Sequence, residues 1–170
     1  MLLKTKRTAM SGLLLALTII FLYAESILPT ARLSMYALSS FIVSIIIINY
    51  SPKAGWFFFV ASCLLALIVI PDKIGIIPYV AFFGVYGIIK FYIEKLGKRL
   101  PEYLLKLLFY NLVLVLGLLF MREFLFESVK FSGSLWILAV LSEIVFLIYD
   151  YVYSLFIGFY TSRLSRYFKG

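Results

Sequence analysis

Six long runs of apolar residues divide this 170-residue chain, and they constrain its fold more than any other feature. They cover approximately residues 9–28, 34–50, 54–70, 76–92, 103–121 and 134–160. A helix that crosses the hydrocarbon core of a bilayer needs roughly 20 apolar residues, and about 17 when it stands upright. The sequence therefore predicts an all-α polytopic membrane protein with six transmembrane helices, in a single domain over residues 1–170.

The composition supports a membrane setting. The chain is 64% hydrophobic and 14% charged, whereas soluble domains are about 45–50% apolar and about 25% charged. Water is therefore a poor solvent for most of the surface that this chain presents. The net charge of +8 is spread over the ends of the apolar runs, so we attribute it to orientation in the membrane and expect no nucleic-acid partner.

Turn residues separate the first four runs. Pro29 follows the first run, Asn49 to Pro52 follow the second, and Pro71 to Lys73 follow the third. Helices do not run easily through such positions. Around 50–53 and 71–75 a re-entrant hairpin could replace a full crossing, so four helices plus such a hairpin is the fallback topology.

Short basic loops stay on the cytoplasmic side of a membrane, so Lys and Arg indicate the orientation. With the N-terminus inside, the inner set is Lys4, Lys6, Arg7, Lys53, Lys90, Lys95, Lys98, Arg99, Arg163, Arg166 and Lys169. The outer set is only Arg32, Lys73, Arg122 and Lys130. This bias predicts a multi-pass protein of the cell membrane with both termini in the cytoplasm (N-in/C-in).

Several kinds of chemistry have no residues to carry them. The chain has no histidine and a single cysteine, Cys63, so the commonest general base is missing and no multi-thiolate metal site can form. No glycine-rich phosphate loop or nucleophile elbow is present. We expect no enzymatic activity, no cofactor and no metal, and any ATP-driven step needs another chain.

Ionisable residues inside apolar runs are costly, so each needs a partner or a use. Glu143 and Asp150 lie seven residues apart in the last run, on one face of a helix. For Glu143, a role in a central pocket with Asn111 and a role as a structural hydrogen-bonding group are equally favoured. For Asp150 we favour a structural role, with Asn111, Lys90 and Lys106 at similar depth.

Polar and aromatic residues gather at the expected outer ends of the runs. Glu25, Arg32 and Tyr36 flank the first outer turn, Asp72 and Lys73 the second, and Arg122 and Glu123 end the fifth run. Tyr79, Phe83 and Tyr86 follow the i, i+4, i+7 spacing of one helical face, which suits stacking on a flat ligand. Interfacial snorkelling and an aromatic belt explain the same residues without a ligand.

Small residues recur in the first run, at Ala9, Gly12 and Ala16. A small residue at every fourth position, as in Gly12 and Ala16, lets another helix approach closely. With its size, its six runs and its basic inner ends, the whole chain resembles a substrate-binding S component of an energy-coupling factor (ECF) transporter. The stretch Thr8–Thr18 is similar to the family's Ala-x-x-x-Ala signature, although Leu13 follows Ala9 at i+4.

The resemblance implies capture of a vitamin or related micronutrient in the outer half of the protein. It also implies docking through Ala9, Gly12 and Ala16 on a transmembrane coupling (T) component, which works with two ABC ATPases. The predicted substrate-binding residues are Glu25, Arg32, Tyr36, Tyr79, Phe83, Tyr86, Asn111 and Glu143. The acidic members favour a substrate with a cationic or hydrogen-donating ring.

Two other classes stay open. A membrane scaffold of the cell-shape or sporulation type has a similar size and charge bias, and it predicts no tightly bound small ligand. A small ion-coupled carrier with Glu143 as its titrating site predicts transport without ATPases and a strong loss on Glu143→Gln.

Overall fold

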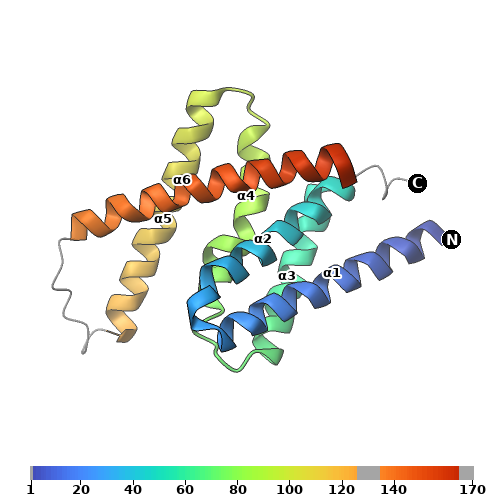
Figure 1. Ribbon diagram of the computed structural model, residues 1–170, viewed down its shortest axis with the longest axis horizontal. Helices are drawn as coiled ribbons and strands as arrows, with labels where there is room; N and C mark the ends of the chain where they lie inside the picture. Colours follow the sequence, from blue (N-terminus) through green and yellow to red (C-terminus); the bar gives the residue numbers. More distant parts are fainter. Residues whose placement is uncertain (1, 126–134, 165–170) are drawn as a thin grey trace. The chain divides into compact units, whose positions relative to one another are not determined.

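The computed structural model describes residues 2–125 and 135–164, and over these ranges the chain is helical with no strand (Figure 1). The elements in chain order are α1 (Leu2–Ile27), η1 (Pro29–Ala31), α2 (Arg32–Asn49), α3 (Pro52–Val69), η2 (Tyr79–Phe83), α4 (Gly84–Glu94), α5 (Arg99–Leu125), α6 (Leu135–Phe159) and η3 (Tyr160–Leu164). The all-α prediction is confirmed. Each apolar run except the fourth coincides with one long α-helix.

Five helices of the described chain are long and apolar enough to cross a membrane, which is consistent with a membrane protein. These candidate spans are Thr5–Ile27, Arg32–Asn49, Pro52–Val69, Arg99–Leu119 and Ala139–Arg163. The span beginning at Pro52 is one unbroken helix, so the junction at 50–53 is a turn between two full-length helices.

The fourth run, expected as a crossing at 76–92, forms differently. Its first part is the π-helix η2, and the α-helix that follows, α4, has only 11 residues. A π-helix is wider than an α-helix and usually occurs as a single turn. The fourth run is therefore not among the five long spans.

Polar contacts define both ends of α3. The Ser51 side chain accepts a hydrogen bond from the backbone N–H of Ala54, and Pro52 occupies the first turn. Pro is suited to this position because the N–H it lacks has no partner there in any helix. At the other end Lys73 donates to the carbonyls of Leu67 and Ile70. A cation on these last carbonyls complements the helix dipole.

The chain forms two compact units. The first contains the residues up to Tyr92 together with the chain from Phe156 onward, and the second contains Ile93–Leu155.

In the first unit, α1, α2 and α3 pack against one another around an apolar core. The core residues are Leu14, Leu22, Tyr36, Ile42, Val43, Ile46, Ile47, Phe58, Phe59, Ala66, Ile70, Ile76, Tyr79 and Ile88. Small hydroxyl residues are buried beside this core, and Thr18, Ser39 and Ser62 satisfy their hydroxyls on carbonyls of their own helices. Small side chains of this kind allow apolar helices to approach closely.

Helix α4 ends at Glu94, and the chain turns at Gly97. The φ of 67° at Gly97 is the left-handed conformation that glycine adopts without strain. The chain then returns as α5. Tyr110 of α5 stacks on Phe146 of α6, with ring centroids 4.5 Å apart. Side-chain contacts between residues 106–111 and 143–150 join the two helices.

Candidate functional site

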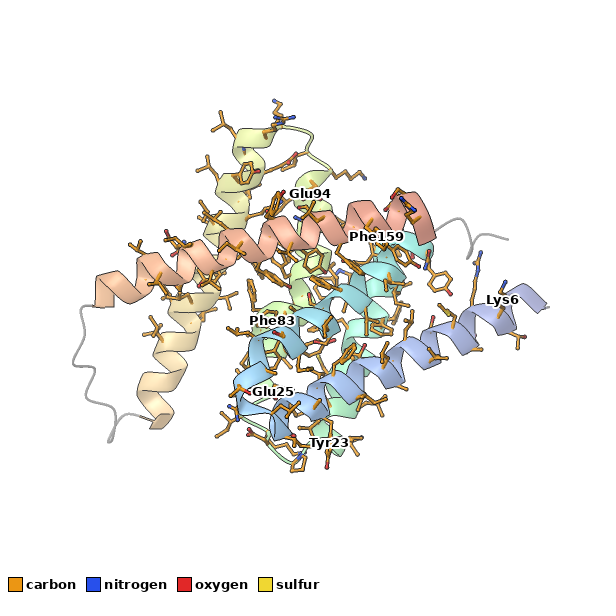
Figure 2. All side chains as sticks on the ribbon, viewed as in Figure 1. Lys6, Tyr23, Glu25, Phe83, Glu94 and Phe159 are labelled. Atoms are coloured by element: carbon orange, nitrogen blue, oxygen red, sulfur yellow. The ribbon has the colours of Figure 1, made fainter. Side chains whose placement is uncertain are left out.

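Glu25 is the centre of a polar cluster at the C-terminal end of α1. Glu25 is only 1% exposed. Oε1 of its side chain lies 3.3 Å from Nε of Arg32 in an ion pair. That geometry is not that of a hydrogen bond, so Oε1 accepts none from the described residues. Figure 2 shows Glu25 and Lys6 at opposite ends of α1. A buried carboxylate oxygen without a hydrogen bond costs free energy. Oε1 of Glu25 therefore remains able to accept a hydrogen bond from a ligand.

The loop after α3 closes over this cluster. The backbone N–H of Gly75 donates to Oδ1 of Asp72 at 3.1 Å, and the Tyr36 hydroxyl donates to the Gly75 carbonyl at 2.5 Å. A Cβ at Gly75 would lie 2.9 Å from Oδ2 of Asp72 and 3.1 Å from Oε2 of Glu25. Two carboxylates therefore converge on this residue, and only glycine leaves room for both.

Aromatic rings lie beside the same cluster. Tyr36 stacks on Phe83 with centroids 5.2 Å apart. Tyr79 is fully buried, and its hydroxyl lies 2.8 Å from Oγ of Ser62. Tyr86 is also fully buried. The structure thus brings Glu25, Arg32, Tyr36 and Phe83 of the predicted binding residues together, with Tyr79 and Tyr86 in the interior.

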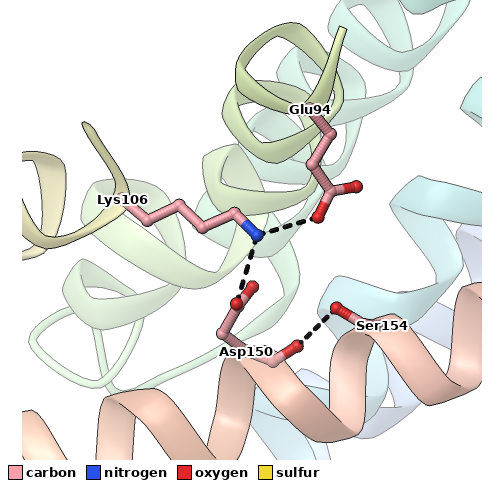
Figure 3. Close-up of polar contacts among 4 residues, drawn as sticks. All are labelled: Glu94, Lys106, Asp150 and Ser154. Carbon is pink, nitrogen blue, oxygen red and sulfur yellow. Dashed lines mark hydrogen bonds and ion pairs between the residues drawn. The ribbon is translucent and has the colours of Figure 1, made fainter. Parts of the chain in front are cut away.

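The second unit holds an ion-pair cluster around Lys106 (Figure 3). The Lys106 ammonium lies 2.8 Å from Oε1 of Glu94 and 3.1 Å from Oδ2 of Asp150. Lys106 and Asp150 are each 5% exposed. In Figure 3 the Ser154 hydroxyl donates to the Asp150 carbonyl one turn earlier on α6. Lys106, expected at a similar depth to Asp150, is its partner in the structure, and the structural role of Asp150 stays a prediction.

Asn111 and Glu143 also meet in the second unit. The Asn111 amide donates to the Leu107 carbonyl at 3.0 Å and to Oε1 of Glu143 at 3.3 Å. Asn111 is exposed and Glu143 is half-buried. The predicted proximity of these two residues is confirmed, whereas their predicted role in binding a substrate stays a prediction.

The small residues Ala9, Gly12 and Ala16 are all exposed on α1. A Cβ placed at Gly12 would meet nothing within 4 Å. This face is therefore open to another helix. Arg122 and Glu123, expected at the outer end of the fifth run, have side chains outside the described residues.

Two features of the clusters carry little sequence signal. The role of Gly75 depends on the return of a loop toward α1, so a single glycine in the sequence does not indicate it. The Glu94–Lys106 pair joins residues on two helices, and only the i, i+4 spacing of Glu94 to Lys98 suggests a pairing in the sequence. Because the helix ends at Glu94 and the chain turns at Gly97, no helix extends across that spacing.

Within the described residues no group of three or more His, Cys, Asp or Glu side chains is arranged to hold a metal ion. Comparison of the chain with family models, with curated proteins and with solved structures finds no match. The described chain is a helical protein whose apolar helices are consistent with a membrane protein.

Proposed function

We propose that this chain is the membrane-embedded substrate-capture subunit of an ECF-type micronutrient transporter, with a vitamin or related small molecule as its substrate. It crosses the cell membrane six times with both termini in the cytoplasm, and the helical stretch 77–94 supplies the fourth crossing. A separate transmembrane coupling subunit and two ABC ATPases supply the energy.

The observation that carries the proposal is the division of α1 into two parts. Its first half exposes the small-residue face of Ala9, Gly12 and Ala16, and its far end buries Glu25 against Arg32. At 1.5 Å per residue, Ala9 and Glu25 lie about 24 Å apart along the helix. One helix therefore offers a surface for a partner helix at one end and polar groups for a ligand at the other.

Charge supports the orientation. At the N-terminal end of α1, Arg7 lies over the ring of Tyr50, which follows α2, and Lys53 lies in the first turn of α3. At the opposite end, carboxylates and cations balance through Glu25, Arg32, Asp72 and Lys73. A basic end retained in the cytoplasm and a neutral end outside agree with the positive-inside rule.

The first test is native mass spectrometry of the detergent-purified chain, with released small molecules identified after denaturation. We expect a stoichiometric vitamin-like compound, retained in the wild type and lost in Glu25→Gln. An empty protein that also fails to bind the coupling subunit and ATPases on coexpression would overturn the proposal in favour of a scaffold.

Docking is tested separately by Gly12→Leu, with Gly117→Leu as the matched control. Both glycines lie in apolar helices with nothing within 4 Å of a built Cβ, so neither leucine meets a clash inside the chain. We expect Gly12→Leu to lose the coupling subunit in a pull-down and Gly117→Leu to keep it. Equal retention by both variants would show that the face on α1 is not the docking surface.

A further inference from the structure

Charge in the first unit is separated along α1 and α3. The side-chain carboxylates of this unit are Glu25, near the C-terminal end of α1, and Asp72, just after α3. Arg7 and Lys53 lie near the N-terminal ends of the same two helices. At 1.5 Å per residue, Arg7 and Glu25 lie about 27 Å apart along α1, and exposed charges are screened beyond about 8 Å at physiological salt. These carboxylates therefore leave the cations at the N-terminal ends unneutralised.

Arg7 and Lys53 meet beside the junction between α2 and α3. The Arg7 guanidinium lies 5.8 Å from the centroid of the Tyr50 ring, and Tyr50 follows the last residue of α2. Lys53 lies in the first turn of α3, one turn after Tyr50. Two helices that are far apart in the sequence therefore bring a cation each to this junction.

A third element joins the same junction from the C-terminal part of the chain. The side-chain amide of Asn49, the last residue of α2, donates a hydrogen bond to the Tyr160 hydroxyl at 2.6 Å. This bond holds the start of η3 beside the end of α2, and Arg163 lies within η3. We call Arg7, Lys53 and Arg163 the basic cluster.

No carboxylate in the described part of the chain offsets the basic cluster. Its three side chains are exposed, and none of them forms an ion pair there. Lys53 also stands in the first turn of a helix that has no acidic residue in that turn. The partial positive charge of a helix N-terminus favours an anion and disfavours a cation. Three cations and one helix N-terminus therefore have the sign of an anion-binding site.

We propose that the basic cluster binds the phosphate of an anionic phospholipid such as phosphatidylglycerol. Each member lies within three residues of the end of a candidate span, at Thr5, Pro52 or Arg163. The ends of spanning helices lie at headgroup depth, and basic groups between such helices on the cytoplasmic side bind anionic headgroups. The inference goes beyond substrate capture, and it rests on these spans crossing a bilayer with the N-terminus in the cytoplasm.

Native mass spectrometry of the delipidated full chain measures this binding. The protein in detergent is titrated with phosphatidylglycerol, with phosphatidylcholine of the same acyl chains, or with inorganic phosphate. We expect phosphatidylglycerol to bind about a hundredfold more tightly than phosphatidylcholine, because each of three cations near a membrane surface contributes about fivefold. Equal affinities for the two lipids would overturn the proposal. Displacement of phosphatidylglycerol by inorganic phosphate would assign the cluster to a soluble anion and would also overturn it.

Charge substitutions locate the site. Arg7→Gln, Lys53→Gln and Arg163→Gln are each expected to lower the affinity for phosphatidylglycerol about fivefold, and the triple variant is expected to bind both lipids equally. Lys53→Arg keeps the charge and is expected to bind like the wild type. Lys98→Gln is the matched control, because it removes one exposed cation from the second unit. Unchanged affinity for phosphatidylcholine in every variant shows that the fold is intact.

Two further outcomes overturn the proposal. An equal loss in Lys98→Gln and in the single cluster variants would show diffuse attraction to net charge, and a triple variant that still prefers phosphatidylglycerol would place the lipid elsewhere. A wild-type chain that prefers phosphatidylglycerol and carries no vitamin-like compound would support the lipid site and count only against the proposed function.

Discussion

The two units of this chain hold their helices together by different means. In the first, α1, α2 and α3 pack around an apolar core with hydroxyl residues buried beside it. In the second, α5 and α6 meet through the Lys106–Asp150 ion pair, the Asn111–Glu143 hydrogen bond and the Tyr110–Phe146 stack. The helices of the first unit meet through many small apolar contacts, whereas α5 and α6 of the second meet through an ion pair, a hydrogen bond and an aromatic stack.

This difference predicts where each unit is vulnerable. A packed interface is sensitive to added volume, because protein interiors leave few voids. An interface that contains a buried ion pair is sensitive to the removal of one partner, because the other charge is left buried and unpaired. Substitutions that add volume are therefore expected to destabilise the first unit more, and substitutions that remove a charge are expected to destabilise the second unit more.

The largest effect is expected from Lys106→Met. The substitution leaves Asp150 buried without the ammonium 3.1 Å away, and removing one partner of a buried pair costs about 3–5 kcal/mol. Unfolding in mixed micelles with increasing dodecyl sulfate measures the loss. Lys106→Arg keeps the charge and is expected to lose much less.

The double variant Lys106→Met/Asp150→Leu sharpens this result. Replacing both charges by apolar side chains is often neutral or stabilising, so we expect the double variant to recover most of the stability lost on Lys106→Met. If the two variants were equally unstable, the loss would not come from the isolated carboxylate.

A volume change at Gly55 is expected to have the next largest effect. A Cβ there would lie 2.5 Å from Cγ1 of Ile47, so the methyl group of Gly55→Ala requires the Ile47 side chain or the backbone of α2 or α3 to shift. Overpacking of this kind costs about 1–3 kcal/mol. In Gly117→Ala of α5 the new methyl group meets nothing within 4 Å, and we expect a gain of up to about 1 kcal/mol from helix propensity. Similar losses in both variants would remove the distinction between the units.

The long helices were predictable because an apolar run of about 20 residues has few alternatives in a membrane. The runs at 34–50 and 54–70 coincide with α2 and α3 to within two residues at each end. The run at 76–92 is equally apolar, yet it begins as the π-helix η2. Directly after η2, Gly84 lies against the Phe59 ring, where a Cβ would come within 2.6 Å, and such a contact is not readable from an apolar run.

Members of the candidate clusters could be predicted where a polar side chain lies in an apolar run. They could not be predicted where the contact depends on how the chain folds back on itself. Glu25, Arg32 and Asn111 stand out in apolar surroundings, and the structure gives each a polar partner. Ser62 and Gly75 are ordinary small residues in the sequence. Their contacts exist only because the loop after α3 returns beside α1 and α2.

The smallest effect tests a hydrogen bond inside the packed unit. Ser62 donates to the Phe59 carbonyl at 2.7 Å, so its oxygen is the acceptor for the Tyr79 hydroxyl at 2.8 Å. We expect Ser62→Ala to cost about 1 kcal/mol, the usual net contribution of one buried hydrogen bond. A double-mutant cycle with Tyr79→Phe measures the coupling. Ser142→Ala is the control, because the Ser142 hydroxyl donates to the Ala139 carbonyl of its own helix. A coupling energy near zero would show that packing alone joins η2 to α3, and the contrast between the two units would then be sharper than the contacts indicate.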